Sequence, residues 1–195
     1  MNTLFAHPTR ALTTVPGSLA AAADAAGTSL AESFVACEAV VLVDVSGSMG
    51  AQDSRGGRSR YDVALDELAA LQAAIPGRIA VIAFSDSPLF VPGGAPPYLG
   101  SGTNLTAALQ LAKLADVAGV RFVVVSDGQP DNSLTALEVA RSFTGRIDVV
   151  YVGPEEGARG RAFLDQLAAA CGGRATTADR VKNLADTVGQ LLLGD

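Results

Sequence analysis

The sequence is poor in the residue types on which many catalytic and metal sites depend. It has no tryptophan, aromatic residues make up 5% of its 195 positions, and its single histidine is His7. The two cysteines, Cys37 and Cys171, belong to no CxxC pair, so their spacing does not predict a zinc site. They either form one disulfide or stay as small buried thiols, and we expect the second.

Positive charge is also scarce. Lysine and arginine together number 14 against 20 acidic residues, which gives a net charge of −6 and a pI of about 4.7. Lys113 and Lys182 are the only lysines, and the arginines are scattered along the chain. Because nucleic-acid binding depends on clustered basic side chains that neutralise phosphates, this composition argues against a nucleic-acid partner.

The sequence contains no long apolar run of the kind that crosses a membrane. Its longest uncharged stretch, 87–112, is crowded with proline and glycine, so it does not predict an apolar helix. The stretch FVAC at 34–37 loosely resembles a lipoprotein cleavage box, but Asp24 and Glu32 interrupt the apolar segment that such a signal requires. We therefore expect Cys37 to begin a strand, and the protein to be cytoplasmic with no membrane partner.

The residues that are present predict one α/β domain. Hydrophobic residues make up 49% and charged residues 17%, as in a globular chain with a real core. Apolar runs alternate with segments of helical spacing, which predicts a mostly parallel sheet covered on both faces, and Pro88 and Pro92 suit an edge position for the short strand between them. The expected strands are 38–43, 78–85, 89–91, 120–126, 146–153 and 174–178, and the expected helices are 61–74, 103–117, 133–143, 161–170 and 179–193.

The N-terminal residues 1–36 have a different character. Residues 1–16 lack periodicity and predict an arm, whereas 18–35 are alanine-rich and helical in character. Ser29 and Glu32 have the spacing of a capping box, which predicts the start of a short helix there. In the helix expected at 103–117, the residues predicted to face the core are Leu105, Leu109, Ala112 and Val117.

Three loops that follow strands or precede a helix carry oxygen-bearing side chains. In the first loop, DVSGSMG, Asp44, Ser46 and Ser48 alternate after an apolar strand, so an extended chain points them the same way. In the second loop, Thr103 follows a glycine-rich turn before a helix. In the third loop, SDGQPD, Asp127 follows the apolar run VVVS. Each pattern alone is also typical of helix caps and ordinary turns. Because the carboxyl ends of parallel strands open on one edge of a sheet, we expect the five side chains to gather there.

Two carboxylates and three hydroxyls, without histidine or cysteine, are ligands suited to a hard cation such as Mg²⁺, with Mn²⁺ or Ca²⁺ as alternatives. Neutral hydroxyl ligands leave part of the ion's charge uncancelled. Mg²⁺ also keeps some of its waters, so the predicted site has an open coordination position. The hypothesis is that an acidic side chain of another molecule completes the coordination.

At these motifs the sequence resembles von Willebrand factor A (vWA) domains. DVSGSMG matches that family's DxSxS loop, GTNLTAAL its threonine loop and VVVSDGQPD its second aspartate loop, so the resemblance covers about 37–195, with 1–36 as an arm and short helix packed on that domain. It implies a Rossmann-like, mostly parallel six-stranded sheet with one short antiparallel edge strand. It also implies a complete metal-ion-dependent adhesion site (MIDAS) whose ligands, direct or water-bridged, are Asp44, Ser46, Ser48, Thr103 and Asp127.

The resemblance also implies a function. Such domains generally bind a partner protein through a metal-bridged carboxylate and are not enzymes. Bacterial single-domain relatives often work with AAA+ ATPases of the MoxR type, so by analogy such an ATPase or its substrate is a candidate partner. Switchable relatives suggest that the helix at 179–193 shifts on ligand binding.

An enzymatic alternative is a haloacid-dehalogenase-like, Mg²⁺-dependent phosphatase with Asp44 as nucleophile. That chemistry normally needs a second aspartate two residues later, where this chain has Ser46, and a lysine that steadies the phosphate. Lys113 lies within the helix expected at 103–117, on a pattern that looks solvent-facing. The sequence therefore favours the binding module over this enzyme.

Three further alternatives also have less support than the binding module. A serine hydrolase built on Ser48 lacks the G-x-S-x-G pattern, and His7 in the arm is the only histidine available for a triad. A nucleotide-binding domain lacks both common phosphate-binding glycine motifs. A vWA domain with a structural role only stays open as the third alternative.

Several neighbouring side chains have roles that the sequence leaves open. Asp53 and Asp62 either support the metal or are exposed loop charges, and the second is favoured. Asp131 either orders the third loop or caps the helix near Ser133. Asn104 is expected to brace Thr103, and Met49 to pack behind the first loop.

Overall fold

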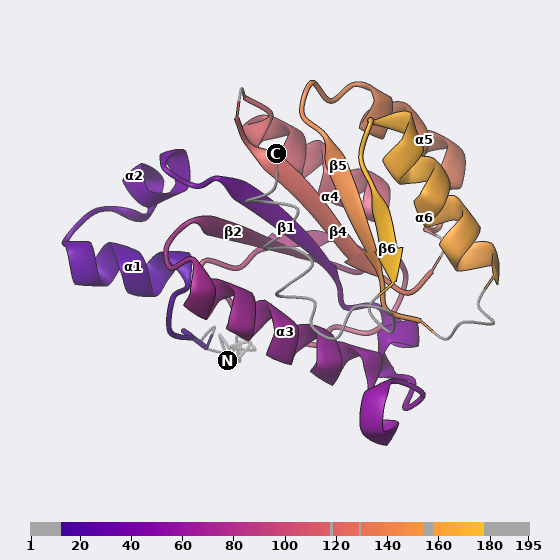
Figure 1. Ribbon diagram of the computed structural model, residues 1–195, viewed down its shortest axis with the longest axis horizontal. Helices are drawn as coiled ribbons and strands as arrows, with labels where there is room; N and C mark the ends of the chain where they lie inside the picture. The colour runs from indigo at the N-terminus through magenta and orange to yellow at the C-terminus, as the bar shows by residue number, and fades with distance from the viewer. Residues whose placement is uncertain (1–12, 118, 129, 154–157, 178–195) are drawn as a thin grey trace, which may run out of the picture.

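The computed structural model describes residues 13–117, 119–128, 130–153 and 158–177. Within them, helices and strands alternate along the chain, and the strands form one twisted sheet with helices on both sides (Figure 1). The strands are β1 Ala39–Asp44, β2 Ile79–Phe84, β3 Pro88–Phe90, β4 Arg121–Ser126, β5 Ile147–Tyr151 and β6 Ala175–Thr177. The α-helices are α1 Leu19–Ala26, α2 Leu30–Val35, α3 Arg60–Ala74, α4 Leu105–Ala112, α5 Ser133–Arg141 and α6 Ala158–Ala170.

The sheet has six strands in the order β3-β2-β1-β4-β5-β6. All neighbouring strands are parallel except β3, which runs antiparallel to β2 at the edge. The predicted α/β fold class, with a mostly parallel six-stranded sheet and one short antiparallel edge strand, is confirmed. The chain builds outward from β1 to β3 on one side and from β4 to β6 on the other, so the strand order reverses between β1 and β4.

The core lies on both faces of the sheet. Alternate residues of β1 point to opposite faces, so Val40 and Leu42 join one apolar cluster while Val41 and Val43 join the other. The first cluster includes buried residues of α4, α5 and α6, and the second includes those of α3. All six residues of β1 are buried, as expected for a central parallel strand.

The helix expected at 103–117 is shorter than predicted. α4 ends at Ala112 and continues as a 3-10 turn over Lys113–Ala115. The predicted inward position of Val117 is wrong, because that side chain is 61% exposed. The buried Asp116 carboxylate accepts hydrogen bonds from the backbone N–H groups of Thr144 and Gly145 at 2.8 Å each, and these bonds fix the chain in a turn instead of another helical turn.

The N-terminal helices pack at the end of the sheet where β2 begins. The predicted capping box is present: Ser29 N–H donates to Glu32 Oε2 at 2.8 Å, and Glu32 N–H donates to Ser29 Oγ at 3.2 Å. Just before β2, Gly77 N–H donates to the Gly17 carbonyl at 2.9 Å. The predicted helix at 179–193 and most of the predicted arm, residues 1–12, lie outside the described residues.

Both cysteines are free thiols, as expected. Cys37 is buried, and burial raises the pKa of its thiol, but it precedes β1, which begins at Ala39 and not at Cys37 as predicted. Cys171, after α6, is half-buried and not fully buried as predicted. Within the described ranges, no helix combines the length and apolar character needed to cross a bilayer.

Candidate metal centre

The candidate site lies where the strand order reverses, at the carboxyl ends of β1 and β4. Asp44 is the last residue of β1, and Asp127 directly follows β4. Val43 is paired with Val125 in the parallel register, so the ends of these two strands lie side by side. This is the position at which open α/β sheets commonly bind ligands.

Asp44 is the most enclosed member of the site, with no exposed surface. Its Oδ1 accepts a hydrogen bond from Ser46 N–H at 2.9 Å, and its Oδ2 accepts one from Ser126 Oγ at 2.6 Å. Burial raises the pKa of the Asp44 carboxyl to about 6, although the hydrogen bonds from Ser126 and Ser46 act in the opposite direction; the negative charge of Asp127 raises it further. The folded chain thus holds an oriented carboxylate whose charge is poorly compensated.

The remaining side chains of the first loop connect Asp44 to the third loop. The hydroxyls of Ser46 and Ser48 lie 3.2 Å apart, and Ser48 Oγ donates to Asp127 Oδ1 at 2.9 Å. Ser46 and Asp127 are buried, whereas Ser48 is exposed at the mouth of the site. The structure therefore brings together four of the five predicted residues, which are Asp44, Ser46, Ser48 and Asp127.

Thr103 lies apart from this chain of hydrogen bonds. Among the described residues, the Thr103 side chain makes no hydrogen bond to the other four predicted ligands. Its loop is nevertheless adjacent to the first loop, because Gly47 N–H donates to the Ser101 carbonyl at 3.0 Å. The Thr103 N–H is held by both Asp131 carboxylate oxygens at 3.1 Å, and Asp131 N–H donates back to the Thr103 carbonyl at 3.0 Å.

Asp131 therefore ties the second loop to the third. It does not cap α5, whose cap is Asn132: the Asn132 Oδ1 accepts from Thr135 N–H at 3.1 Å. Asn104 caps α4 by accepting from Ala107 N–H at 3.1 Å, and its side-chain amide donates to the Asp86 carbonyl at 3.1 Å. Asn104 thus fixes the backbone next to Thr103.

Met49 packs behind the first loop, as expected. It is fully buried in the cluster on the α3 face of the sheet, within the 3-10 turn Gly47–Gly50. On the outer side of the same loop, Tyr98 Oη donates to the Gly47 carbonyl at 3.1 Å. Tyr98 also packs edge-on against Tyr61, with ring centroids 5.3 Å apart. The loop is therefore held from both sides.

Two residues of the site were not predicted from the sequence. One is Ser126, which holds Asp44. The other is Arg60, the first residue of α3, whose Nη1 donates to Asp127 Oδ2 at 2.5 Å. Arg60 also forms a two-point ion pair with Asp53, through Nε to Oδ1 at 2.7 Å and Nη2 to Oδ2 at 2.5 Å. This hydrogen-bonded guanidinium lowers the pKa of the Asp53 carboxyl.

Asp53 and Asp62 are both exposed, as favoured from the sequence. Asp53 nevertheless reaches the site indirectly, through Arg60. Asp62 belongs to the N-terminal cap of α3, where its N–H donates to Ser59 Oγ at 3.0 Å and its carboxylate accepts from the same hydroxyl at 2.6 Å.

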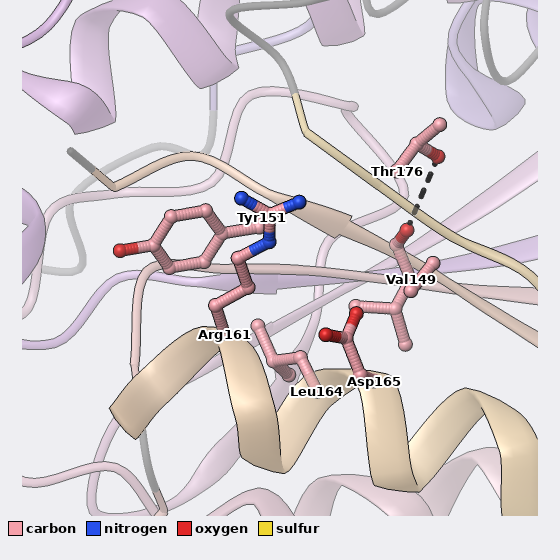
Figure 2. A pocket seen from close by; sticks show the side chains of 7 residues that line it. Val149, Tyr151, Arg161, Leu164, Asp165 and Thr176 are labelled. Atoms are coloured by element: carbon pink, nitrogen blue, oxygen red, sulfur yellow. Dashed lines mark hydrogen bonds between the residues drawn. The ribbon is translucent and has the colours of Figure 1, made fainter. Parts of the chain in front are cut away.

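A small pocket of about 170 Å³ opens between α6 and the β5–β6 edge of the sheet. Figure 2 shows Arg161, Leu164 and Asp165 rising from α6 towards β5, with Arg161 extending towards Tyr151 and Asp165 towards Val149. Thr176 Oγ1 donates to the Val149 carbonyl at 3.4 Å. Burial raises the pKa of the Tyr151 phenol, while the nearby positive charges of Arg60 and Arg161 oppose that shift. Tyr151 lines this pocket and is paired with Ser126 of β4 in the parallel register, one residue before Asp127.

The side chains of the site fit a hard divalent cation by their chemistry. The five candidate ligands all present oxygen, and the hydrogen bonds to the buried Asp44 carboxylate come from serines and not from a basic side chain. Within the described residues, no cluster of three histidine, cysteine or acidic side chains suited to a metal is present. A soft metal such as zinc does not match this set.

Three solved structures illustrate the similarity of the fold to known proteins. One is an aerotolerance-related membrane protein from Bacteroides fragilis, with a TM-score of 0.62 and 18% identity over 82% of this chain and 100% of that chain. Another is a von Willebrand factor type A structure from Catenulispora acidiphila, with a TM-score of 0.59 and 17% identity over 79% of this chain and 41% of that one. The chain has the fold of a vWA domain. A third is manganese-loaded TRAP protein from Plasmodium vivax, with a TM-score of 0.54 and 17% identity over 75% of this chain and 70% of that one.

No protein-family model matches the sequence, and no curated protein matches it either. At these identities the structural likeness describes the fold, and the function has to be argued from the site.

Proposed function

We propose that the chain is a metal-ion-dependent protein-binding module in which a bound divalent cation accepts an acidic side chain of a partner protein. The observation that carries the proposal is the hydrogen-bonded series Asp44, Ser46, Ser48 and Asp127 at the strand-order reversal of a vWA fold. The Plasmodium vivax protein of this fold is manganese-loaded, which supports a divalent cation here. Mg²⁺ is the proposed ion, with Mn²⁺ or Ca²⁺ as substitutes.

Each residue has a distinct part in this proposal. Asp44 supplies charge from the floor of the site, and Ser126 and the Ser46 N–H fix its orientation. Ser46 and Ser48 supply neutral oxygens, and Thr103 supplies one from the neighbouring loop. Asp127 supplies its carboxylate to the ion, directly or through water. The cation, when bound, supplies Lewis acidity towards a carboxylate oxygen of the partner.

The proposed partner is a protein with an exposed Asp or Glu, for which a MoxR-type AAA+ ATPase or its substrate is a candidate. The acidic composition supports neither a nucleic-acid nor a lipid-surface partner, since both bind through basic side chains. A cytoplasmic location belongs to the same proposal.

The phosphatase alternative has no observation in its favour. Ser46 stands where a second aspartate is needed. Lys113 lies at the end of α4 remote from Thr103, and its Nζ pairs with Asp116 at 2.5 Å. Among the described residues, no lysine is recorded within contact of Asp44.

The proposal is tested by affinity capture from the native lysate. Immobilised wild-type protein is compared in Mg²⁺, in EDTA and in EDTA followed by excess Mg²⁺, together with D44A in Mg²⁺. D24A is the control, because Asp24 is an exposed acid of α1. A protein retained by wild type and D24A only in Mg²⁺, and lost in D44A, supports the proposal. The same proteins in every sample would contradict it and favour a purely structural domain.

A further inference from the structure

Arg60 is the one basic side chain recorded in contact with the candidate ligands within the described part of the chain. The Arg60 side chain is only 12% exposed, and the Asp127 side chain that it contacts is 1% exposed. The Arg60 backbone is fixed as well, since its N–H donates to the Ala51 carbonyl at 3.2 Å. The positively charged guanidinium of Arg60 is thus largely enclosed and held in a fixed orientation beside Asp127.

The two oxygens of Asp127 are divided between two partners. Oδ1 accepts from Ser48, and Oδ2 accepts from Arg60. A divalent ion held by Asp127, directly or through water, has to share that carboxylate with a guanidinium that carries a full positive charge. Like charges repel strongly where water is largely excluded, so the guanidinium opposes the ion.

Asp53 provides the second half of the arrangement. It binds Arg60 through two parallel hydrogen bonds, and its own side chain is 41% exposed. This planar two-point pair does not depend on Asp127. Arg60 therefore keeps a partner at the edge of the site if its bond to Asp127 breaks.

From this geometry we propose that Arg60 is an internal competitor of the divalent cation. It neutralises Asp127 in the metal-free protein, and the ion, when it binds, breaks the bond between Arg60 and Asp127 and leaves Arg60 paired with Asp53 alone. The inference rests on the proposed metal site and adds its regulation: Arg60 sets the cation concentration at which the site fills. It also explains how two buried carboxylates are tolerated before the ion arrives.

The test is a titration of the purified full chain with Mn²⁺, followed by electron paramagnetic resonance of the free ion. The variants are R60Q, R60K and the double variant R60Q with D44N. The matched control is R58Q, because Arg58 lies two residues earlier and pairs with Asp66 at 2.6 Å on the exposed surface. We expect R60Q to bind Mn²⁺ at least tenfold more tightly than wild type and R60K to lie between the two. R58Q should match wild type, and D44N should abolish the binding of R60Q.

The outcomes separate this inference from the proposed function. Wild type and R60Q with the same Mn²⁺ affinity, or a weaker R60Q, would overturn the role of Arg60 and leave the metal site standing. Absence of Mn²⁺ binding from both would overturn the two proposals together.

A second measurement uses the wild-type chain and does not depend on the folding of a variant. The ¹⁵Nε resonance of the Arg60 side chain is followed during a Mg²⁺ titration, with the Arg58 resonance as reference. The Arg60 resonance should shift and saturate with the ion while that of Arg58 stays in place. An Arg60 resonance unchanged at saturating Mg²⁺ would contradict displacement.

Discussion

Ser126 Oγ donates a 2.6 Å hydrogen bond to Asp44 Oδ2, joining the ends of β4 and β1 beneath the candidate metal centre. Both side chains are almost completely buried. This bond fixes the orientation of the carboxylate that the proposal makes the deepest metal ligand. Loss of a hydrogen bond that orients a metal ligand typically lowers metal affinity by about 10–100-fold.

Replacing Ser126 by alanine should therefore weaken metal binding while the fold is retained. We expect a loss of about tenfold or more in Mg²⁺ affinity, the scale typical of partners that orient a ligand. Isothermal titration calorimetry measures the affinity, and circular dichroism checks the fold. S142A is the control, since Ser142 lies at the end of α5 and bonds the Val139 carbonyl. Equal affinity in S126A and wild type would rule out this role for Ser126.

Asp131 should position the threonine loop. The D131A variant loses the two contacts at 3.1 Å on Thr103 N–H, so that amide should exchange faster with solvent. The loss of an exposed hydrogen bond to a charged group should cost about 1 kcal/mol in free energy of unfolding, and metal affinity should fall with it. Hydrogen-exchange NMR at Thr103 gives the direct measurement. D131N, which keeps one acceptor oxygen, should recover part of the protection, and an unchanged exchange rate in D131A would be contrary to expectation.

Met49 should stabilise the first loop from within the core. M49A should lower the free energy of unfolding by about 2–5 kcal/mol, because Met49 is fully buried and the truncation leaves a cavity. M49L nearly conserves volume, so its cost should stay below about 1.5 kcal/mol. Urea denaturation of the metal-free proteins measures both. L114A provides the comparison, since Leu114 is 81% exposed and its truncation should change stability by less than about 0.5 kcal/mol.

Asp116 should make stability depend on pH in the acid range. Burial alone would raise the pKa of its carboxyl, but the hydrogen bonds from Lys113 and from the N–H groups of Thr144 and Gly145 outweigh burial and lower that pKa from 3.8 to about 2. A lowered pKa in the folded state means that the ionised carboxylate stabilises the fold. That contribution is complete above about pH 4 and is lost as the pH falls through about 2.

The D116N variant tests this dependence. At pH 7 its free energy of unfolding should be about 1–3 kcal/mol lower than that of wild type, because a buried, hydrogen-bonded charge is lost. The difference should narrow between pH 4 and pH 2, where Asp116 becomes protonated in the wild type. Urea denaturation at pH 7, 4 and 2.5 measures it. A difference that stays constant over this range would show that the charge of Asp116 does not contribute.

The regular elements were largely predictable from local pattern. β1, β2, β4 and β5 are short apolar runs bounded by polar or turn residues, and each lies within about two residues of its predicted bounds. The edge strand predicted at 89–91 is β3, Pro88–Phe90, one residue earlier than predicted. Its edge position was correctly predicted from the neighbouring prolines, because proline removes a ladder hydrogen bond. The helix predicted through Val117 failed because its end is set by Asp116, whose partners Thr144 and Gly145 lie 28 and 29 residues further along the chain. Local spacing carries no information on such a contact.

The candidate site divides in a similar way. Asp44, Ser46, Ser48 and Asp127 follow the ends of two apolar strands, and the general rule for parallel sheets places such residues together. Ser126 could have been found only from the register, since the pairing of Val43 with Val125 puts the next residues of both strands opposite each other. Arg60 has no local signal that separates it from Arg58. Its role comes from how the start of α3 meets the third loop, a contact across 67 residues.

The most direct test of the account is the stoichiometry of Mg²⁺ binding to the purified chain and to its D44N variant, measured by isothermal titration calorimetry at pH 7.5. Asparagine at position 44 keeps the size of the buried side chain and removes its charge, so the fold should persist. The account predicts one bound ion per chain in the wild type and none in D44N at the same concentrations. A wild-type chain that binds no divalent ion, or a D44N variant that binds it equally well, would contradict the account.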